Sequence, residues 1–319
     1  MTKKSKDKKS RRAPRGRKVF DELLELVTEK TNPNSRNLHN LSTVSILRLM
    51  NKEDALVARA VGREIKYIAR AAEMAVKTFK SKGRMFYLGA GTSGRLGALD
   101  AAECPPTFGT DPKMIRGIIA GGAASLVRSR EGVEDDIEKV SQDLREYGIM
   151  KGDLVIGITA SRRTPYVLEG LRQAKRIGAA TIFICCNPRK GVPRLFDLSI
   201  CPVVGPEIIA GSSRMKAGTA QKLVLNMIST AAMIKMGKVY GNRMVDLKAT
   251  SEKLKERSKR VIMEICDIDY DAADSILKRS GGSVKTAVVM VKTGLTRKEA
   301  ENRLNRAGGF VHKALRRPR

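Results

Sequence analysis

A glycine-rich turn after a short apolar run constrains the fold of this chain more than any other feature. Residues 85–108 read MFYLGAGTSGRLGALDAAECPPTF, and Thr92 and Ser93 stand among the glycines. This pattern predicts a strand at 85–88, a tight turn, a helix start, and a rigid exit at Pro105-Pro106. Glycines let the backbone approach a ligand, and the free N–H groups of a helix N-terminus attract anions. The turn therefore favours a bound phosphate.

Short apolar runs alternate with helical segments from residue 84 to about 236. The runs lie at 85–88, 115–119, 154–158, 181–185 and 198–203. Such runs predict an α/β fold, a doubly wound parallel five-stranded sheet with helices on both faces. Ligands of these sheets bind beyond the carboxyl ends of the strands, where the strand order reverses. We expect the glycine turn and the loops at Ser161 and Ser212 to form one site there.

Helical patterns flank the predicted sheet on both sides. In the N-terminal flank a break at 32–35 precedes one helix that starts at Ser42-Thr43 and a second that starts at Asn51. A longer helix then ends at Lys82-Gly83. In the C-terminal flank we expect a small bundle for packing or dimerisation, with three short helices at 267–279, 283–293 and 296–306.

These patterns predict four parts of the chain. They are a disordered basic tail at 1–18, an N-terminal helical segment at 19–83, the sheet domain at 84–250 and the helical bundle at 251–319.

The chain is strongly basic, with a formal net charge of +29 over 319 residues. Ten of the first eighteen residues are Lys or Arg, and Asp7 is their one acid. A basic body favours anionic partners. The tail is interpreted as solvated, or alternatively as a weak, salt-sensitive contact with nucleic acid. No aromatic residue precedes Phe20, so base stacking has little support.

Composition argues against several classes of protein. No apolar run reaches the roughly 18 residues of a membrane span, and no apolar segment follows the basic N-terminus, so we expect a cytoplasmic protein without membrane contact. The five cysteines lack CxxC spacing and only two histidines exist, which predicts buried reduced thiols and no metal site. Neither histidine lies near a nucleophile motif, so no Ser/His/Asp triad is expected.

The glycine turn also satisfies the dinucleotide fingerprint GxGxxG, which alone is a weak signal. That fingerprint needs an acid at the end of the next strand to hold ribose hydroxyls. Here Ala120-Gly121-Gly122 follows the run 115–119. We therefore expect no nicotinamide cofactor and favour a phosphate monoester.

Two further loops and two carboxylates complete the candidate site. Ser161, Arg162, Arg163 and Thr164 offer hydroxyls and guanidinium groups to a phosphate, or form an exposed basic loop. The polar segment 211–219 opens an apolar helix and predicts a third anion-binding helix end. Glu103 and Glu134 can divide acid and base roles, although spacing alone favours Glu134 as a helix-surface residue.

Long motifs resemble N-acetylmuramic acid 6-phosphate etherases, a family with the sugar isomerase (SIS) fold. The similarity runs from about Thr28 to the C-terminus. It includes TEKTNPNS, LST, YLGAGTSGRLGALDAAECPPTF, AGG, EGVEDD, TPYV, GSSRMKAGTAQKLVLNMIST and GKVYGNRMVDL. The resemblance implies a phosphosugar-binding SIS domain at 84–250, a homodimer whose N-terminal helices help complete the partner's site, and no cofactor.

The resemblance also implies the activity. This family cleaves the D-lactyl ether of N-acetylmuramic acid 6-phosphate into N-acetylglucosamine 6-phosphate and D-lactate, during recycling of cell-wall amino sugars. Glu103 matches the family's acid and Glu134 a second catalytic carboxylate; we hypothesise that Glu134 removes the C2 proton. The expected substrate-binding residues are Gly91, Thr92, Ser93, Ser161, Arg163, Thr164, Ser212, Ser213, Arg214 and Lys216.

The sequence departs from the family pattern at three positions. Arg162 replaces the glycine of ASGRTPY, His39 replaces an Asp, and Ser251 replaces an Asn. If residue 162 has positive φ, the arginine strains the loop by about 1 kcal/mol or more; otherwise it adds a phosphate contact. The alternative function is a non-catalytic phosphosugar sensor on the same fold, as in glucokinase regulatory proteins.

Overall fold

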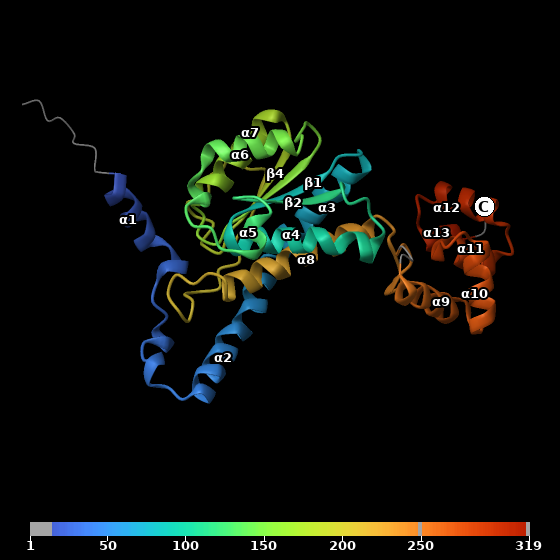
Figure 1. Ribbon diagram of the computed structural model, residues 1–319, viewed down its shortest axis with the longest axis horizontal. Coiled ribbons are helices and arrows are strands. Elements are labelled where there is room, and N and C mark those ends of the chain that lie inside the picture. The colour runs from blue at the N-terminus through green and yellow to red at the C-terminus, as the bar shows by residue number, and fades with distance from the viewer. Residues whose placement is uncertain (1–14, 248–250, 317–319) are drawn as a thin grey trace, which may run out of the picture.

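The computed structural model describes residues 15–247 and 251–316 (Figure 1). Most of the predicted disordered tail, 1–14, lies outside the described residues. Its last part was predicted wrongly, because helix α1 (Arg15–Glu25) already begins at Arg15. None of the helices in the described ranges is long and apolar enough to cross a membrane.

A five-stranded sheet forms the centre of the molecule, in the order β2-β1-β3-β4-β5, and every neighbouring pair is parallel. This confirms the predicted doubly wound sheet. The strand order reverses between β1 and β3. The strands are β1 (Met85–Gly89), β2 (Ile115–Ile119), β3 (Leu154–Ile158), β4 (Ala180–Ile184) and β5 (Leu198–Ile200), so the last strand is shorter than the predicted 198–203.

Successive strand residues point to opposite sides of the sheet, so these apolar strands present a hydrophobic surface on each face, and helices cover both. Met85 and Tyr87 face one hydrophobic core, whereas Phe86 and Leu88 face the other. The first core also contains residues of α2 (Thr43–Gly62), α3 (Ile65–Lys80), α4 (Gly91–Phe108) and α8 (Lys216–Lys235). The second is covered by α6 (Ile137–Glu146) and α7 (Pro165–Ile177). The N-terminal helices α2 and α3 thus share the core of the sheet.

Helix α2 corrects the prediction that a helix starts at Asn51. It begins after Ser42, whose hydroxyl accepts a hydrogen bond from the N–H of Ser45, and continues without a break to Gly62. Glu53 is therefore an interior residue of α2 and not a first-turn residue. Its carboxylate is buried and pairs with Lys216 of α8. The following helix, α3, begins only at Ile65.

Helix α4 corrects the predicted exit at the two prolines. It passes through Pro105 and Pro106 and ends at Gly109, whose φ of +62° places it in the left-handed region. The N–H of Gly109 bonds to the carbonyl of Pro105. Cys104 and Phe108, on either side of the prolines, are buried in the core, and this packing holds the last turn helical.

The C-terminal flank is a helical bundle with its own hydrophobic core (Figure 1, orange to red). The three expected helices are present, and two additional helices lie at the ends of the bundle. Asp267 ends the first of these five helices instead of starting the next. The helices are α9 (Glu252–Cys266), α10 (Tyr270–Arg279), α11 (Val284–Thr293), α12 (Arg297–Arg306) and α13 (Val311–Ala314).

Short elements connect these parts. They are η1 (Val27–Glu29), η2 (Pro33–Ser35), η3 (Leu38–Asn40), α5 (Ala124–Val127), η4 (Val133–Asp135) and the hairpin β6 (Val239–Tyr240) and β7 (Arg243–Met244). All five cysteines are unpaired and buried, as predicted.

Candidate functional site

The glycine turn brings the start of α4 directly against the end of β1. A Cβ atom on Gly94 would lie 2.6 Å from Cγ1 of Ile119 and 2.8 Å from the carbonyl oxygen of Gly89. Only glycine fits this approach. The N-cap residue, Ala90, provides no side-chain cap among the described residues. The first N–H groups of α4 are therefore available to an anion at the carboxyl end of β1.

The Ser161 loop forms a second helix start at the end of β3. The hydroxyls of Thr159 and Thr164 are 2.7 Å apart and hydrogen-bonded. Ser161 Oγ accepts a bond of 3.4 Å from the N–H of Arg163. Thr164 is the N-cap of α7 and makes no side-chain capping bond in the part of the chain that the structure describes; Pro165 occupies the first helical position.

These two uncapped helix N-termini flank the point where the strand order reverses. Gly89 ends β1 and pairs in register with Ile158, which ends β3. The starts of α4 and α7, with several hydroxyl groups, thus lie at one edge of the sheet, after the neighbouring strands β1 and β3. Doubly wound sheets bind their ligands at this position. The two free helix starts at this edge are the geometry on which the expectation of an anion site rests.

The start of α8 reaches the same edge but is not a free anion site. Glu207 is fully buried, and its carboxylate accepts hydrogen bonds from the N–H groups of Lys216 (3.0 Å) and Ala217 (2.9 Å). Burial raises the pKa of Glu207, and these two N–H donors oppose the rise. The predicted third anion-binding helix end is therefore wrong, because a carboxylate from the chain itself already caps it.

Lys216 is only 2% exposed, and its ammonium lies 2.6 Å from Oε2 of Glu53 on α2. Asn32 and Asn34 each donate a 2.9 Å hydrogen bond to the same carboxylate. The pair joins α2, the η2 segment and α8 behind the edge of the sheet. Ser212 and Ser213 are half-buried just before this helix, while Arg214 is exposed.

Helices α4 and α8 meet at the edge of the sheet. Ser93 Oγ donates a 2.9 Å hydrogen bond to Oε1 of Gln221. A Cβ atom on Gly218 would lie 3.4 Å from Cγ2 of Thr92. The glycine turn and the start of α8 are therefore neighbours, as predicted for a single site.

Two buried polar residues at this edge were missed from the sequence. Asn187 is fully buried after β4; its side chain bonds to the carbonyl of Ala160, the hydroxyl of Thr28 and the N–H of Val27. Gln221 is 1% exposed, and its Nε2 has no partner among the described residues. Two features of the sequence could have identified them: Asn187 follows an apolar strand directly, and Gln221 lies within an apolar helix.

The arginines of the Ser161 loop contact α1. Arg162 has a φ of +62°, so the condition for backbone strain is met. Its guanidinium donates a 2.7 Å bond to the carbonyl of Lys190 and lies 3.8 Å from Glu25. Arg163 contacts the carbonyl of Val19 at 3.4 Å and Glu22 at 3.5 Å. Helix α1 therefore covers both cations.

The two candidate carboxylates, Glu103 and Glu134, occupy different places in the fold. Glu134 lies half-buried in η4, which contacts α7, and its neighbour Val133 approaches Gly121 just beyond the end of β2. Glu103 lies exposed on α4, twelve residues after Gly91, or about 18 Å along the helix axis. Of these two carboxylates, only Glu134 therefore lies at the edge where the helix starts converge.

Comparisons with known proteins agree with this fold. Residues 67–175 match the model of the glucokinase regulatory protein N-terminal SIS domain, and residues 147–231 match the SIS domain model. An N-acetylmuramic acid 6-phosphate etherase from Salinibacter ruber is 52% identical over 95% of this chain and 98% of its own.

Two further relatives carry the same name. Those from Pasteurella multocida and Geobacillus sp. are 50% and 51% identical over 91% and 92% of this chain, and 96% and 99% of their own. This chain belongs to the N-acetylmuramic acid 6-phosphate etherase family.

Proposed function

We propose that this enzyme cleaves the D-lactyl ether of N-acetylmuramic acid 6-phosphate, giving N-acetylglucosamine 6-phosphate and D-lactate. The observation that carries this conclusion is the pair of uncapped helix N-termini at the strand reversal, with Glu134 at the same edge. The names of relatives about 50% identical over nearly the whole chain support the same reaction.

The proposed reaction is an elimination followed by an addition of water. In the open-chain sugar, the C1 aldehyde acidifies the hydrogen on C2, and Glu134 takes that proton as general base. The C3–O bond then breaks, and Glu103 gives a proton to the departing lactate oxygen. Water adds across the resulting C2=C3 bond, with OH at C3 and H at C2. Both carboxylates are accessible enough for these roles.

The substrate phosphate is proposed to bind between the starts of α4 and α7. Backbone N–H groups of Gly91 to Ser93 and the hydroxyls of Thr92, Ser161 and Thr164 would donate to it. Arg163 is proposed as a further phosphate contact, in competition with Glu22 of α1. Ser212, Ser213 and Arg214 remain proposed contacts of the sugar or the lactyl carboxylate. Lys216 would act indirectly, because its ammonium is engaged by Glu53.

A homodimer would bring Glu103 to a second active site. Helices α3 and α8 share an apolar groove of about 470 Å³, lined by residues such as Ile65, Met227 and Ile234. Asn226 on its rim donates a 2.6 Å bond to Asp100, one turn before Glu103 on α4. A second copy packed on this groove would therefore meet the surface that carries Glu103. On α2, the exposed Val44 and Leu47 offer further apolar surface to a partner.

The alternative function is a phosphosugar-binding regulator without turnover. The match to the glucokinase regulatory protein domain and the strained Arg162 favour it. The presence of both Glu103 and Glu134 favours the enzyme. A regulator would be stabilised against heat by the phosphosugar but would release no lactate.

The decisive test is release of D-lactate from N-acetylmuramic acid 6-phosphate. Glu103→Gln and Glu134→Gln should each abolish it without lowering the melting temperature, while the exposed control Glu138→Gln should keep it. Mixing the two inactive variants should restore about a quarter of the activity if each site takes one glutamate from each subunit of a twofold dimer. Full activity in either single variant would refute the assignment.

We also infer a cytoplasmic location, because the substrate is a phosphosugar and all five thiols are free. The tail remains a proposed weak contact for nucleic acid; deleting residues 1–14 and measuring the salt dependence of RNA binding tests it.

A further inference from the structure

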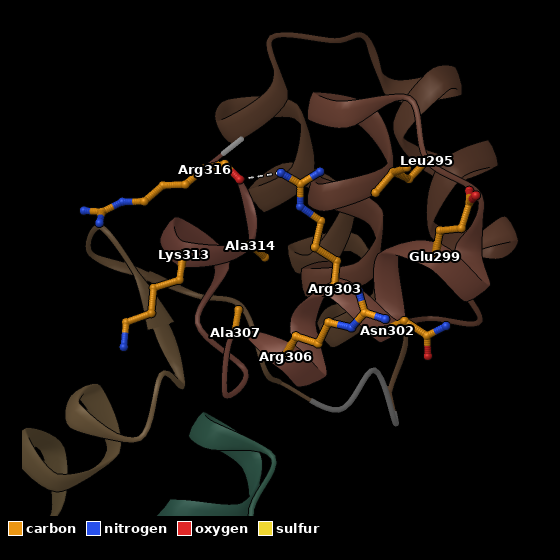
Figure 2. A pocket seen from close by; sticks show the side chains of 9 residues that line it. All are labelled: Leu295, Glu299, Asn302, Arg303, Arg306, Ala307, Lys313, Ala314 and Arg316. Carbon is orange, nitrogen blue, oxygen red and sulfur yellow. Dashed lines mark hydrogen bonds between the residues drawn. The ribbon is translucent and has the colours of Figure 1, made fainter. Parts of the chain in front are cut away.

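A charged cleft lies in the C-terminal bundle, far along the chain from the sheet. It is a cleft of about 560 Å³ beside α12 and α13 (Figure 2). Its apolar part consists of Leu295, Ala307 and Ala314. Figure 2 shows the two alanines between the side chain of Lys313 and those of Arg303 and Arg306. An apolar floor with a few polar groups around it is typical of small-molecule sites of this volume.

Four cations line this cleft, namely Arg303, Arg306, Lys313 and Arg316. Some cations elsewhere in the bundle are paired with acids: Lys278 lies 2.6 Å from Asp274, and Arg297 lies 2.8 Å from Glu301. Within residues 15–247 and 251–316, no carboxylate lies within 4.0 Å of the charged nitrogens of these four cations. The cleft therefore concentrates positive charge that the described part of the bundle does not neutralise.

The one acid that lines the cleft does not reduce this imbalance much. Glu299 accepts hydrogen bonds from the N–H (2.8 Å) and hydroxyl (2.7 Å) of Thr296, in the capping box that starts α12. These two bonds lower the pKa of Glu299, so it stays a capping carboxylate. The negative charge of Glu299 lies at the start of α12, whereas Arg303 and Arg306 lie in the last turn of the same helix.

Two of the four cations, Arg303 and Lys313, are already held in place. Arg303 donates a 2.5 Å hydrogen bond to the carbonyl of Arg316 (Figure 2). The ammonium of Lys313 lies 4.4 Å from the centre of the Phe310 ring. Side chains that are ordered before binding lose less entropy when a ligand arrives. The guanidinium fork also matches phosphate oxygens in a bidentate way.

We propose that this cleft binds a small ligand that carries one or more phosphate groups. A long nucleic acid fits less well, because no aromatic side chain lines the cleft for base stacking and Lys313 lies over one face of the nearby Phe310. The proposal uses residues that the proposed catalytic function does not use, so either can fail alone.

The test uses the full-length protein and an environment-sensitive dye on Asn302→Cys. Labelling is selective because the five native cysteines are buried. Titration with pyrophosphate should give a saturable signal. Arg306→Gln and Lys313→Gln should each weaken binding about tenfold, because each removes a charge-assisted hydrogen bond. Lys278→Gln removes one positive charge from the same bundle outside the cleft and should bind as before, as should the sheet-site variant Ser161→Ala.

Three outcomes would overturn the proposal. One is the absence of a saturable signal in a protein whose circular dichroism is unchanged. Another is an equal weakening by Lys278→Gln, which would indicate a general charge effect. The third is tighter binding of a single-stranded RNA oligonucleotide than of pyrophosphate, which would make the cleft part of a polyanion surface.

Discussion

The buried pair of Glu53 and Lys216 allows a sharp test of how the N-terminal segment is held to the site. Glu53→Gln keeps the shape of the side chain but leaves the ammonium of Lys216, 2% exposed, without its carboxylate. Removing one partner of a buried pair costs about 3–5 kcal/mol. At about 2 °C per kcal/mol for a chain of this size, the melting temperature should fall by about 6–10 °C.

The measurement is thermal unfolding by calorimetry at neutral pH. Lys216→Met in the Glu53→Gln background should recover at least half of the loss, because the unpaired buried charge is gone. Glu73→Gln, an exposed change on α3, should leave the melting temperature unaltered. A fall of less than 2 °C for Glu53→Gln, or a double variant as unstable as the sum of the single changes, would refute this account.

The same pair predicts a pH dependence. Burial by itself raises the pKa of Glu53, but the hydrogen bonds from Lys216, Asn34 and Asn32 outweigh it and bring the pKa below its usual value of 4.5. A lowered pKa in the folded state stabilises the protein above pH 4.5, and this stability is lost as the pH falls through the folded-state pKa. The difference in stability between the wild type and Glu53→Gln should therefore shrink below pH 4.5.

Three further predictions concern the turns of the site. Arg162→Gly should keep lactate release within about twofold, because the guanidinium contacts Lys190 and α1. Relief of about 1 kcal/mol of backbone strain should offset the loss of stability from the missing hydrogen bond. A tenfold loss of activity would show that Arg162 contacts substrate. Glu22→Gln should lower KM by up to about fivefold with kcat unchanged, since it releases Arg163; a raised KM would contradict this. Gly94→Ala should lower stability by about 1–3 kcal/mol and impair turnover, because its Cβ would meet backbone and core atoms; Gly62→Ala, with open space around it, should not.

Local sequence was sufficient for the sheet and for two of its helix starts. Apolar runs of strand length, and the turn and helix-start residues around Gly89 and Thr164, are short-range signals. A parallel doubly wound sheet then places the carboxyl ends of all its strands at one edge. The five strands and the two helix starts after β1 and β3 followed from these signals. The buried cysteines followed from composition.

Tertiary packing decided the remaining features, because no local spacing encodes which side chain will occupy a helix end or a buried position. Glu53 became the partner of Lys216 instead of a first-turn residue of a new helix, and Glu207 capped the helix end that had been assigned to the substrate. The distance along α4 separates Glu103 from the edge that holds Glu134. The residue types required for the chemistry could be identified from the sequence, whereas their availability depends on tertiary contacts. These contacts join residues 163 positions apart at Glu53 and Lys216, and 9 positions apart at Glu207 and Lys216.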